Sequence, residues 1–249
     1  MLGIVKPEPY WQYTAYGKHP AVKDYFSVGQ TFSSMRSVSD WIEKGYQLLS
    51  AKKDNALKRC SWRFWARELQ KESIVCGILR DSNDSFGRPY PLLVMGTGVL
   101  KDWEKNWDLI PYACENTWEQ MEYLSTGMFS DLKQLEEEVR KIRPPHADLS
   151  VFASKRDGYK AVRPQNLTVF ERQASKISQN AEAFICLDGD RLYDMFDLIG
   201  LYHVLIKMRI KTPPNAVFMG GTLKNTYLVL FKRPLVPSDF IQLWSDRSA

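Results

Sequence analysis

The stretch DSNDSFGRPYPLLV, residues 81–94, places acidic side chains, a glycine and an arginine directly before an apolar run. Acidic and amide side chains at alternate positions are typical of a calcium loop, which also needs glycine at its sixth position and glutamate at its twelfth. Counting from Asp81, the sixth residue is Phe86 and the twelfth is Leu92. The stretch does not fit a calcium site, and we predict no bound metal.

A phosphate-binding loop is the second chemistry to consider for this stretch. Such a loop needs several glycines and a Gly-Lys-Ser/Thr ending that opens a helix. Here Gly87 is followed by Arg88 and Pro89, and a proline removes one backbone amide from any anion cradle. We therefore predict a turn that leads into a buried strand. Gly87 allows positive φ in this turn, and we predict that Arg88 forms a bidentate ion pair with Asp84.

The stretch YGKHPAVKDYF, residues 16–26, contains a second polar group, in which Lys18, His19 and Asp24 are candidates for nucleophile, base and acid. A His-Pro step after a strand and a glycine is more often a structural turn. The sequence contains no G-x-S-x-G, H-E-x-x-H or G-x-G-x-x-G motif. We predict a protein that is not an enzyme and has no cofactor. The alternative is a small enzyme or nucleotide-binding protein with a Lys/His/Asp cleft.

Composition and charge narrow the class of protein. Of the 249 residues, 44% are apolar and 25% are charged, which is ordinary for a soluble globular chain. No apolar run approaches the roughly 18–20 residues of a membrane span, and the N-terminus lacks the apolar core of a signal peptide. We therefore predict a cytoplasmic protein. Its four cysteines are dispersed without a C-x-x-C pair, which predicts free thiols.

One basic and aromatic segment, LKRCSWRFWARE at residues 57–68, resembles the composition of nucleic-acid binders. With a period of two, however, Trp62 and Phe64 share one face of a strand, and Arg63 and Trp65 share the other. This alternation favours a half-buried strand, and we predict no nucleic-acid partner.

The elements that position these residues follow from hydrophobic periodicity. Strands are predicted at Trp11–Tyr16, Ser61–Ala66, Ile74–Leu79, Pro91–Val99, Leu149–Ala153, Phe184–Leu187, Val217–Met219 and Tyr227–Lys232. One helix follows a stripe of Val38, Trp41, Ile42, Leu48 and Leu49, with Ser37 and Asp40 as a capping box at its start. A second helix follows Leu132, Leu135, Val139 and Ile142, further helices lie within Asp102–Leu124 with a break near Pro111, and another covers Arg191–Met208.

Strands alternate with helices, but several neighbouring strands are joined by short turns. This arrangement favours an α+β (mixed α/β) fold, with a central mixed or mostly antiparallel sheet covered by helices. We predict a single domain over residues 1–249, with a subdomain joint near 143–148, where two prolines follow a helix.

Taken in order, the motifs resemble the TagF family, also called ImpM, of type VI secretion-associated proteins from Gram-negative bacteria. The family pattern runs Gly-Lys-x-Pro…Asp-Phe, then Trp-Arg-Phe, then Ser-x-Asp-x-x-Gly-Arg-x-x-Pro-Leu. The C-terminal stretches PPNAVFMGG and LVLFKRPLVPSDFIQLW add to the resemblance. The matching positions, with His19 between them, are Gly17, Lys18, Pro20, Asp24, Trp62, Arg63, Phe64, Ser82, Asp84, Gly87, Arg88, Pro91 and Leu92. The chain departs from the family at Lys23, where glycine is usual, and at Tyr25, where phenylalanine is usual.

The resemblance implies a cytoplasmic, non-enzymatic regulator that represses type VI secretion after translation. The implied partner is the forkhead-associated scaffold protein of the secretion machinery. Some relatives carry a fused metal-dependent phosphatase domain, but this chain lacks the acid-rich metal motifs of that domain, so we predict no phosphatase activity. The matching residues are expected either to hold the two turns in shape or to contact the partner.

Overall fold

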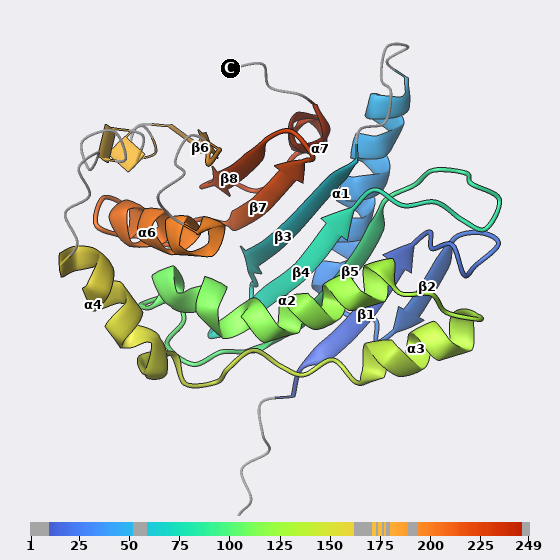
Figure 1. Ribbon diagram of the computed structural model, residues 1–249, viewed down its shortest axis with the longest axis horizontal. Coiled ribbons are helices and arrows are strands. Elements are labelled where there is room, and N and C mark those ends of the chain that lie inside the picture. The colour runs from blue at the N-terminus through green and yellow to red at the C-terminus, as the bar shows by residue number, and fades with distance from the viewer. Residues whose placement is uncertain are drawn as a thin grey trace, which may run out of the picture.

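The computed structural model describes residues 10–51, 59–161, 171–172, 174–175, 177, 180–188 and 194–245. Its centre is one eight-stranded sheet in the order β2-β1-β5-β4-β3-β7-β8-β6, and every neighbouring pair is antiparallel (Figure 1). The strands are β1 Gln12–Gly17, β2 Phe26–Gly29, β3 Cys60–Arg67, β4 Ser73–Arg80, β5 Leu92–Val99, β6 Glu182–Cys186, β7 Ala216–Thr222 and β8 Thr226–Phe231. The predicted α+β class with a mostly antiparallel sheet is confirmed.

Helices cover both faces of this sheet. In the described part of the chain the α-helices are α1 Ser33–Ser50, α2 Ile110–Thr126, α3 Leu132–Arg140, α4 Ala153–Ala161, α6 Met195–Lys207 and α7 Pro237–Trp244. Two short 3₁₀ helices, η1 Trp107–Leu109 and η2 Leu149–Phe152, precede α2 and α4. Figure 1 shows α2, α3, α4 and α6 in front of the sheet, with α1 and α7 behind it.

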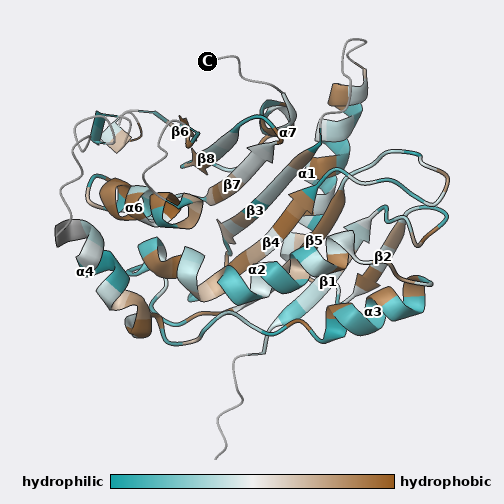
Figure 2. Cartoon of the chain, in the orientation of Figure 1, coloured by the Kyte–Doolittle hydropathy of each residue, from teal (hydrophilic) through white to brown (hydrophobic). Residues whose placement is uncertain are grey.

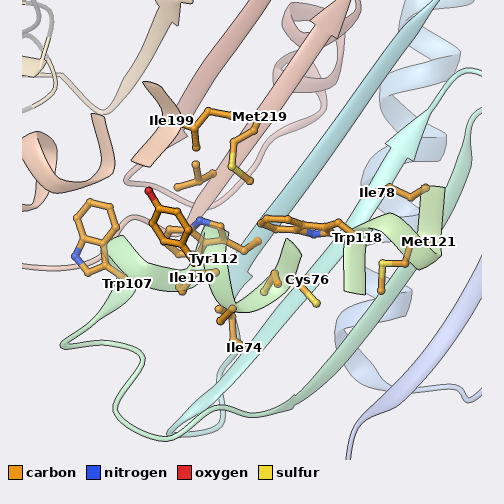
Figure 3. Packing of buried hydrophobic residues seen from close by; sticks show 14 of the residues in the cluster. Ile74, Cys76, Ile78, Trp107, Ile110, Tyr112, Trp118, Met121, Ile199 and Met219 are labelled. Atoms are coloured by element: carbon orange, nitrogen blue, oxygen red, sulfur yellow. The ribbon is translucent and has the colours of Figure 1, made fainter. Parts of the chain in front are cut away.

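The sheet therefore separates two apolar cores. Trp65, Trp107 and Trp118 lie in the core beneath α2 and α6, part of which is drawn in Figure 3. Trp62 and Phe64 lie in the other core, with α1 and α7. Colouring by hydropathy shows the central strands as mainly apolar and the outer sides of α2 and α3 as polar (Figure 2). The predicted alternation within β3 is confirmed, and Trp65 on its second face is also buried, because helices cover both sides of the sheet.

Three details of the predicted helices are wrong or need correction. Helix α1 begins at Ser33 rather than at Ser37, whose Oγ instead donates to the Ser33 carbonyl inside the helix. Leu48, predicted in the apolar stripe, is about half exposed. Pro111 does not break a helix; it lies in the first turn of α2, where its missing amide costs no hydrogen bond.

The predicted strand Leu149–Ala153 is also wrong. These residues form η2 and the start of α4, because the Asp148 carboxylate accepts the Ser150 amide at 2.9 Å and starts a helical turn. The sequence patterns missed β2, α4 and α7. Helix α3 is confirmed, with Asp131 capping its first turn, but Leu132 of the predicted stripe is exposed and Ile142 lies beyond the end of the helix. Helix α6 is confirmed from Met195, and residues 191–193 of its predicted range lie outside the described residues.

Residues 143–148 connect α3 to η2, and the His146 amide donates to the Ala113 carbonyl at 2.9 Å. The sheet contains strands from both sides of this connection, since β3 pairs with β7. The single domain and the joint within it remain predictions.

Candidate functional site

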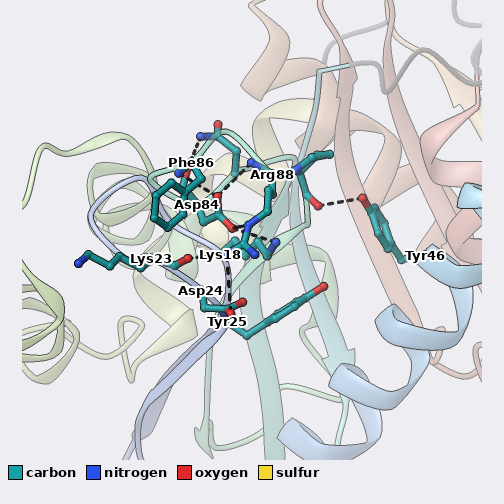
Figure 4. Close-up of polar contacts among 10 residues, drawn as sticks. Lys18, Lys23, Asp24, Tyr25, Tyr46, Asp84, Phe86 and Arg88 are labelled. Atoms are coloured by element: carbon teal, nitrogen blue, oxygen red, sulfur yellow. Dashed lines mark hydrogen bonds and ion pairs between the residues drawn. The ribbon is translucent and has the colours of Figure 1, made fainter.

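Most of the predicted site residues lie in two turns at one end of the sheet. The first turn joins β1 to β2, and the second, residues 81–91, joins β4 to β5. Because β1 pairs with β5, Gly17 lies opposite Leu92 and the two turns lie next to each other. A direct hydrogen bond joins them, from the Ser85 amide to the Val22 carbonyl at 2.9 Å. We call this pair of turns the double turn (Figure 4).

The Asp84 carboxylate is completely buried at the centre of the double turn. Lys18 Nζ lies 3.0 Å from its Oδ2 and Arg88 Nε lies 2.7 Å from the same oxygen. The other oxygen, Oδ1, accepts the backbone amides of Phe86 and Arg88, each at 3.0 Å. One carboxylate thus joins a cation from the first turn to the backbone of the second.

These contacts keep Asp84 ionised. Burial by itself raises the pKa of a carboxyl group, because the charged form loses its hydration. At Asp84 the hydrogen bonds from the Arg88 amide, from the Lys18 and Arg88 side chains and from the Phe86 amide outweigh burial and lower the pKa to about 2. At neutral pH the Asp84 carboxylate is therefore ionised between its two cations, Lys18 and Arg88.

The predicted brace between Asp84 and Arg88 is confirmed, but its bidentate geometry is wrong. Only Nε of Arg88 bonds the carboxylate; Nη2 donates instead to the Lys23 carbonyl at 2.6 Å. The second carboxylate oxygen is already occupied by the two backbone amides. Gly87 has φ of 78°, as predicted for the turn, and its amide donates to the Asp84 carbonyl at 2.9 Å.

The candidate triad of the first turn does not converge. Lys18 is buried against Asp84, and its Nζ lies 4.6 Å from the centre of the Tyr25 ring. His19 is buried, its Nδ1 accepts the Ala21 amide at 3.1 Å, and burial lowers its pKa. Asp24 is exposed and accepts the Tyr25 amide at 2.8 Å. Each of the three side chains thus has its own partner.

The remaining predicted residues divide between the double turn and the sheet. Gly17 ends β1 beside Pro91, so close that a Cβ would lie 2.1 Å from the Pro91 carbonyl oxygen. Ser82 accepts the Tyr90 amide at its carbonyl, and Pro20 is exposed at the surface of the first turn.

Trp62, Arg63 and Phe64 lie on β3, which β5 and β4 separate from β1. Arg63 forms a bidentate ion pair with Glu122 of α2, at 2.6 and 2.7 Å. Trp62 and Phe64 are core residues. The structure therefore does not bring this motif into the double turn.

Two exposed aromatic rings in the double turn were not predicted as site residues. Tyr25 is 53% exposed and Phe86 is 69% exposed. The guanidinium of Arg88, itself about half exposed, lies 5.4 Å from the Phe86 ring centre. The sequence signal for Phe86 was a large aromatic residue inside an otherwise polar turn. We call Tyr25, Phe86 and Arg88 the exposed triplet.

The ring of Tyr25 is supported from beneath. It packs edge-on against Tyr90, with 4.6 Å between ring centres, and Tyr46 of α1 packs against Tyr90 in the same way at 4.9 Å. Tyr46 also donates to the Pro89 carbonyl at 2.9 Å. Helix α1 thus fixes the position of the double turn.

The described part of the chain shows neither a metal-binding cluster nor a membrane-spanning helix. Within the described residues there is no group of three or more His, Cys, Asp or Glu side chains placed to hold a metal ion. None of the helices in this part of the chain is long and apolar enough to cross a membrane.

Comparison with known proteins gave a family match and matches to solved structures. The chain is similar to PA0076 from Pseudomonas aeruginosa PAO1, known from a crystal structure, with 22% identity and a TM-score of 0.43. The similarity covers 53% of this chain and 63% of that chain, so less than two thirds of PA0076 is matched. No curated protein matches the chain.

The family match is to the N-terminal domain of TagF, described as type VI secretion system-associated, and it spans residues 14–142. This range contains both halves of the double turn and more than half of the 249 residues. The chain belongs to the TagF family of type VI secretion system-associated proteins.

Proposed function

We propose that this protein is a cytoplasmic, non-enzymatic regulator that represses type VI secretion after translation by binding the forkhead-associated scaffold protein of the machinery. Family membership supports the link to type VI secretion. The exposed triplet is the observation that carries the binding role. Tyrosine and arginine are over-represented among the residues that contribute most to protein–protein binding, and here they lie beside a third exposed ring.

The rigidity of the double turn also supports a binding role. An arginine that is already held in position loses less side-chain entropy when a partner binds it. Arg88 is held by Asp84 and by the Lys23 carbonyl, and Tyr25 is supported by Tyr90. The double turn therefore presents a preformed surface.

The alternative, an enzyme with a Lys/His/Asp cleft, has less support. Lys18 and His19 are buried and engaged with neighbours, and Asp24 lies at the surface. A nucleophile and its base are expected within hydrogen-bond reach of each other. The separate partners of these three residues favour the non-enzymatic proposal.

The experiment is capture of the scaffold protein by this protein carrying an affinity tag, with purified components. We expect the wild-type protein to capture the scaffold and Arg88→Gln, Tyr25→Ala and Phe86→Ala to weaken binding by about tenfold or more each. Leu69→Ala and Met128→Ala are matched controls, since both side chains are fully exposed and lie outside the double turn. Cells that carry Arg88→Gln should show increased type VI secretion. Absence of capture by the wild-type protein would overturn the proposal.

A further inference from the structure

We propose that the partner adds an extended segment to the exposed edge of β2 and places an acidic side chain of that segment on Arg88. This inference rests on the proposed function, because it describes how the partner of the double turn binds. It begins from the position of β2, which is the last strand at one end of the sheet and follows directly after Tyr25 (Figure 1).

The outer edge of β2 offers backbone hydrogen-bonding groups. In an antiparallel pair, residues alternate between those bonded to the neighbouring strand and those that face away from it. The Gln30 amide donates to the Tyr13 carbonyl at 2.8 Å, and Thr14 Oγ1 donates to the Val28 carbonyl at 2.9 Å, so both of these β2 groups face β1. By this alternation Ser27, the residue before Val28, directs its amide and carbonyl away from β1, and its side chain is exposed.

The segment that follows the first turn lacks the usual protection of an edge strand. Proteins commonly place lysine or proline on such edges, because unpaired backbone groups attract other strands. Residues 25–35, YFSVGQTFSSM, contain neither a charged residue nor a proline. Helix α3 does not replace this protection, because its buried residues Leu135 and Val139 pack with Phe26 and Val28 on the face of the sheet. An extended partner strand therefore meets no charge on this edge.

The charged side chains of the double turn, next to the edge of β2, indicate which charge the partner segment carries. Lys18 and Asp84 are both buried and neutralise each other. Of the remaining charges, Lys23, Arg88 and Asp24 are exposed, and Asp81 at the start of the second turn is half-buried. Asp24 lies 3.7 Å from Nη2 of Arg88, and no hydrogen bond or ion pair within the described residues engages Nη1. A carboxylate on the partner complements this free side of the guanidinium.

The surface also continues beyond the opposite end of β2. A groove of about 520 Å³ lies there, lined from the sheet by Tyr10, Trp11, Gly29 and Gln30 and from the other side by α3. A strand that begins at Arg88 and follows β2 reaches this groove. The geometry thus fits an acidic residue at one end of an extended segment and an apolar or aromatic side chain at the other.

The decisive measurement is amide hydrogen exchange of the full-length protein with and without the purified forkhead-associated scaffold protein. We expect the Ser27 amide to exchange about tenfold more slowly in the complex, because it gains a hydrogen bond, while the Val28 amide changes little. Unchanged exchange at Ser27 in a saturated complex would overturn strand addition. If the Ser27 amide exchanges slowly without the scaffold, and more slowly at higher protein concentration, a second copy of this chain occupies the edge. That result would also overturn the proposal.

Variants separate this inference from the proposed function. Ser27→Pro removes only an outward amide, so we expect binding about tenfold weaker, whereas the control Ser27→Ala keeps the amide and binds within about twofold of wild type. The thermal midpoint of each variant checks folding. If Arg88→Gln loses the scaffold and a folded Ser27→Pro does not, strand addition is wrong and the proposed function stands. If the wild-type protein captures no scaffold, the proposed function itself fails.

Discussion

Two buried aspartates, Asp84 and Asp108, form similar ion pairs in two regions of this molecule, but the two clusters have different roles. Asp84 is completely buried and Asp108 is 1% exposed, and each carboxylate is paired with two cations. At Asp108 the cations are Arg156, bidentate at 2.5 and 2.9 Å, and Lys207. These pairs join η1 to α4 and α6.

The difference lies in how far solvent reaches the cations. The side chains of Arg156 and Lys207 are 21% and 26% exposed, whereas that of Arg88 is 52% exposed and lies beside Tyr25 and Phe86. The Asp108 cluster therefore holds elements together, while Asp84 also holds an arginine at the surface. A buried carboxylate alone does not distinguish the two roles; the exposure of its cation does.

The largest expected effect on stability is at Asp108. Asp108→Asn removes the charge that two mostly buried cations face, and breaking a buried pair in this way costs about 3–5 kcal/mol of unfolding free energy. Urea denaturation measures this loss. Asp102→Asn is the control, since its pair with Lys105 is exposed and its removal should cost less than about 1 kcal/mol. At urea concentrations below its unfolding midpoint, Asp108→Asn should capture the scaffold as well as the wild-type protein does. A loss of capture by folded Asp108→Asn would contradict the contrast between the two aspartates.

The core around the Asp108 cluster also contains a pH-sensitive group. His203 is fully buried, and burial lowers its pKa to about 4 although its ring bonds the Ile199 carbonyl. The unfolded chain takes up a proton below about pH 6.5, and the folded chain takes it up only near pH 4. The unfolding free energy should therefore fall by on the order of 3 kcal/mol between pH 6.5 and pH 4.

His203→Gln tests this assignment, because glutamine does not titrate. Urea denaturation at pH 7 and at pH 4.5 should show a smaller pH dependence in the variant than in the wild-type protein. An equal dependence in both proteins would assign the acid sensitivity to other groups.

At Asp84 the expected loss of stability is smaller, because one of its two cations is half exposed. We expect Asp84→Asn to lower the thermal midpoint by about 5–10 °C and to abolish scaffold capture, since Arg88 loses its anchor. The pKa of Asp84 in the folded protein, about 2, lies below its ordinary value of 3.8. Its contribution to stability is therefore complete above about pH 4 and is lost as the pH falls toward 2. The difference in thermal midpoint between wild type and variant should shrink over the same range.

The smallest change in stability is expected for the exposed triplet itself. Arg88→Gln and Phe86→Ala should each change the unfolding free energy by less than about 1 kcal/mol, because both side chains are more than half exposed. The same variants should weaken scaffold binding by about tenfold or more. Calorimetric titration with the scaffold measures the second quantity. Weak binding together with a large loss of stability would mean that the triplet supports the fold rather than the partner.

Much of the fold could be predicted from the sequence. Apolar runs bounded by turn residues located seven strands, and the motif series identified the family. The elements that were missed, β2, α4 and α7, are short and have weak patterns of their own. Leu149–Ala153 looked like a strand because a short apolar run fits either structure, and the Asp148 cap decided it in favour of helix.

The sequence by itself determined the turn chemistry of residues 81–91, because glycine, proline and an acid with an arginine four residues later restrict the backbone locally. Only the tertiary structure decided that Lys18 completes the ion pair at Asp84, since the two residues meet through the pairing of β1 with β5. It also decided which charges remain accessible. Burial depends on contacts between segments distant in the sequence, and these contacts buried Lys18 while leaving Arg88 beside two exposed rings.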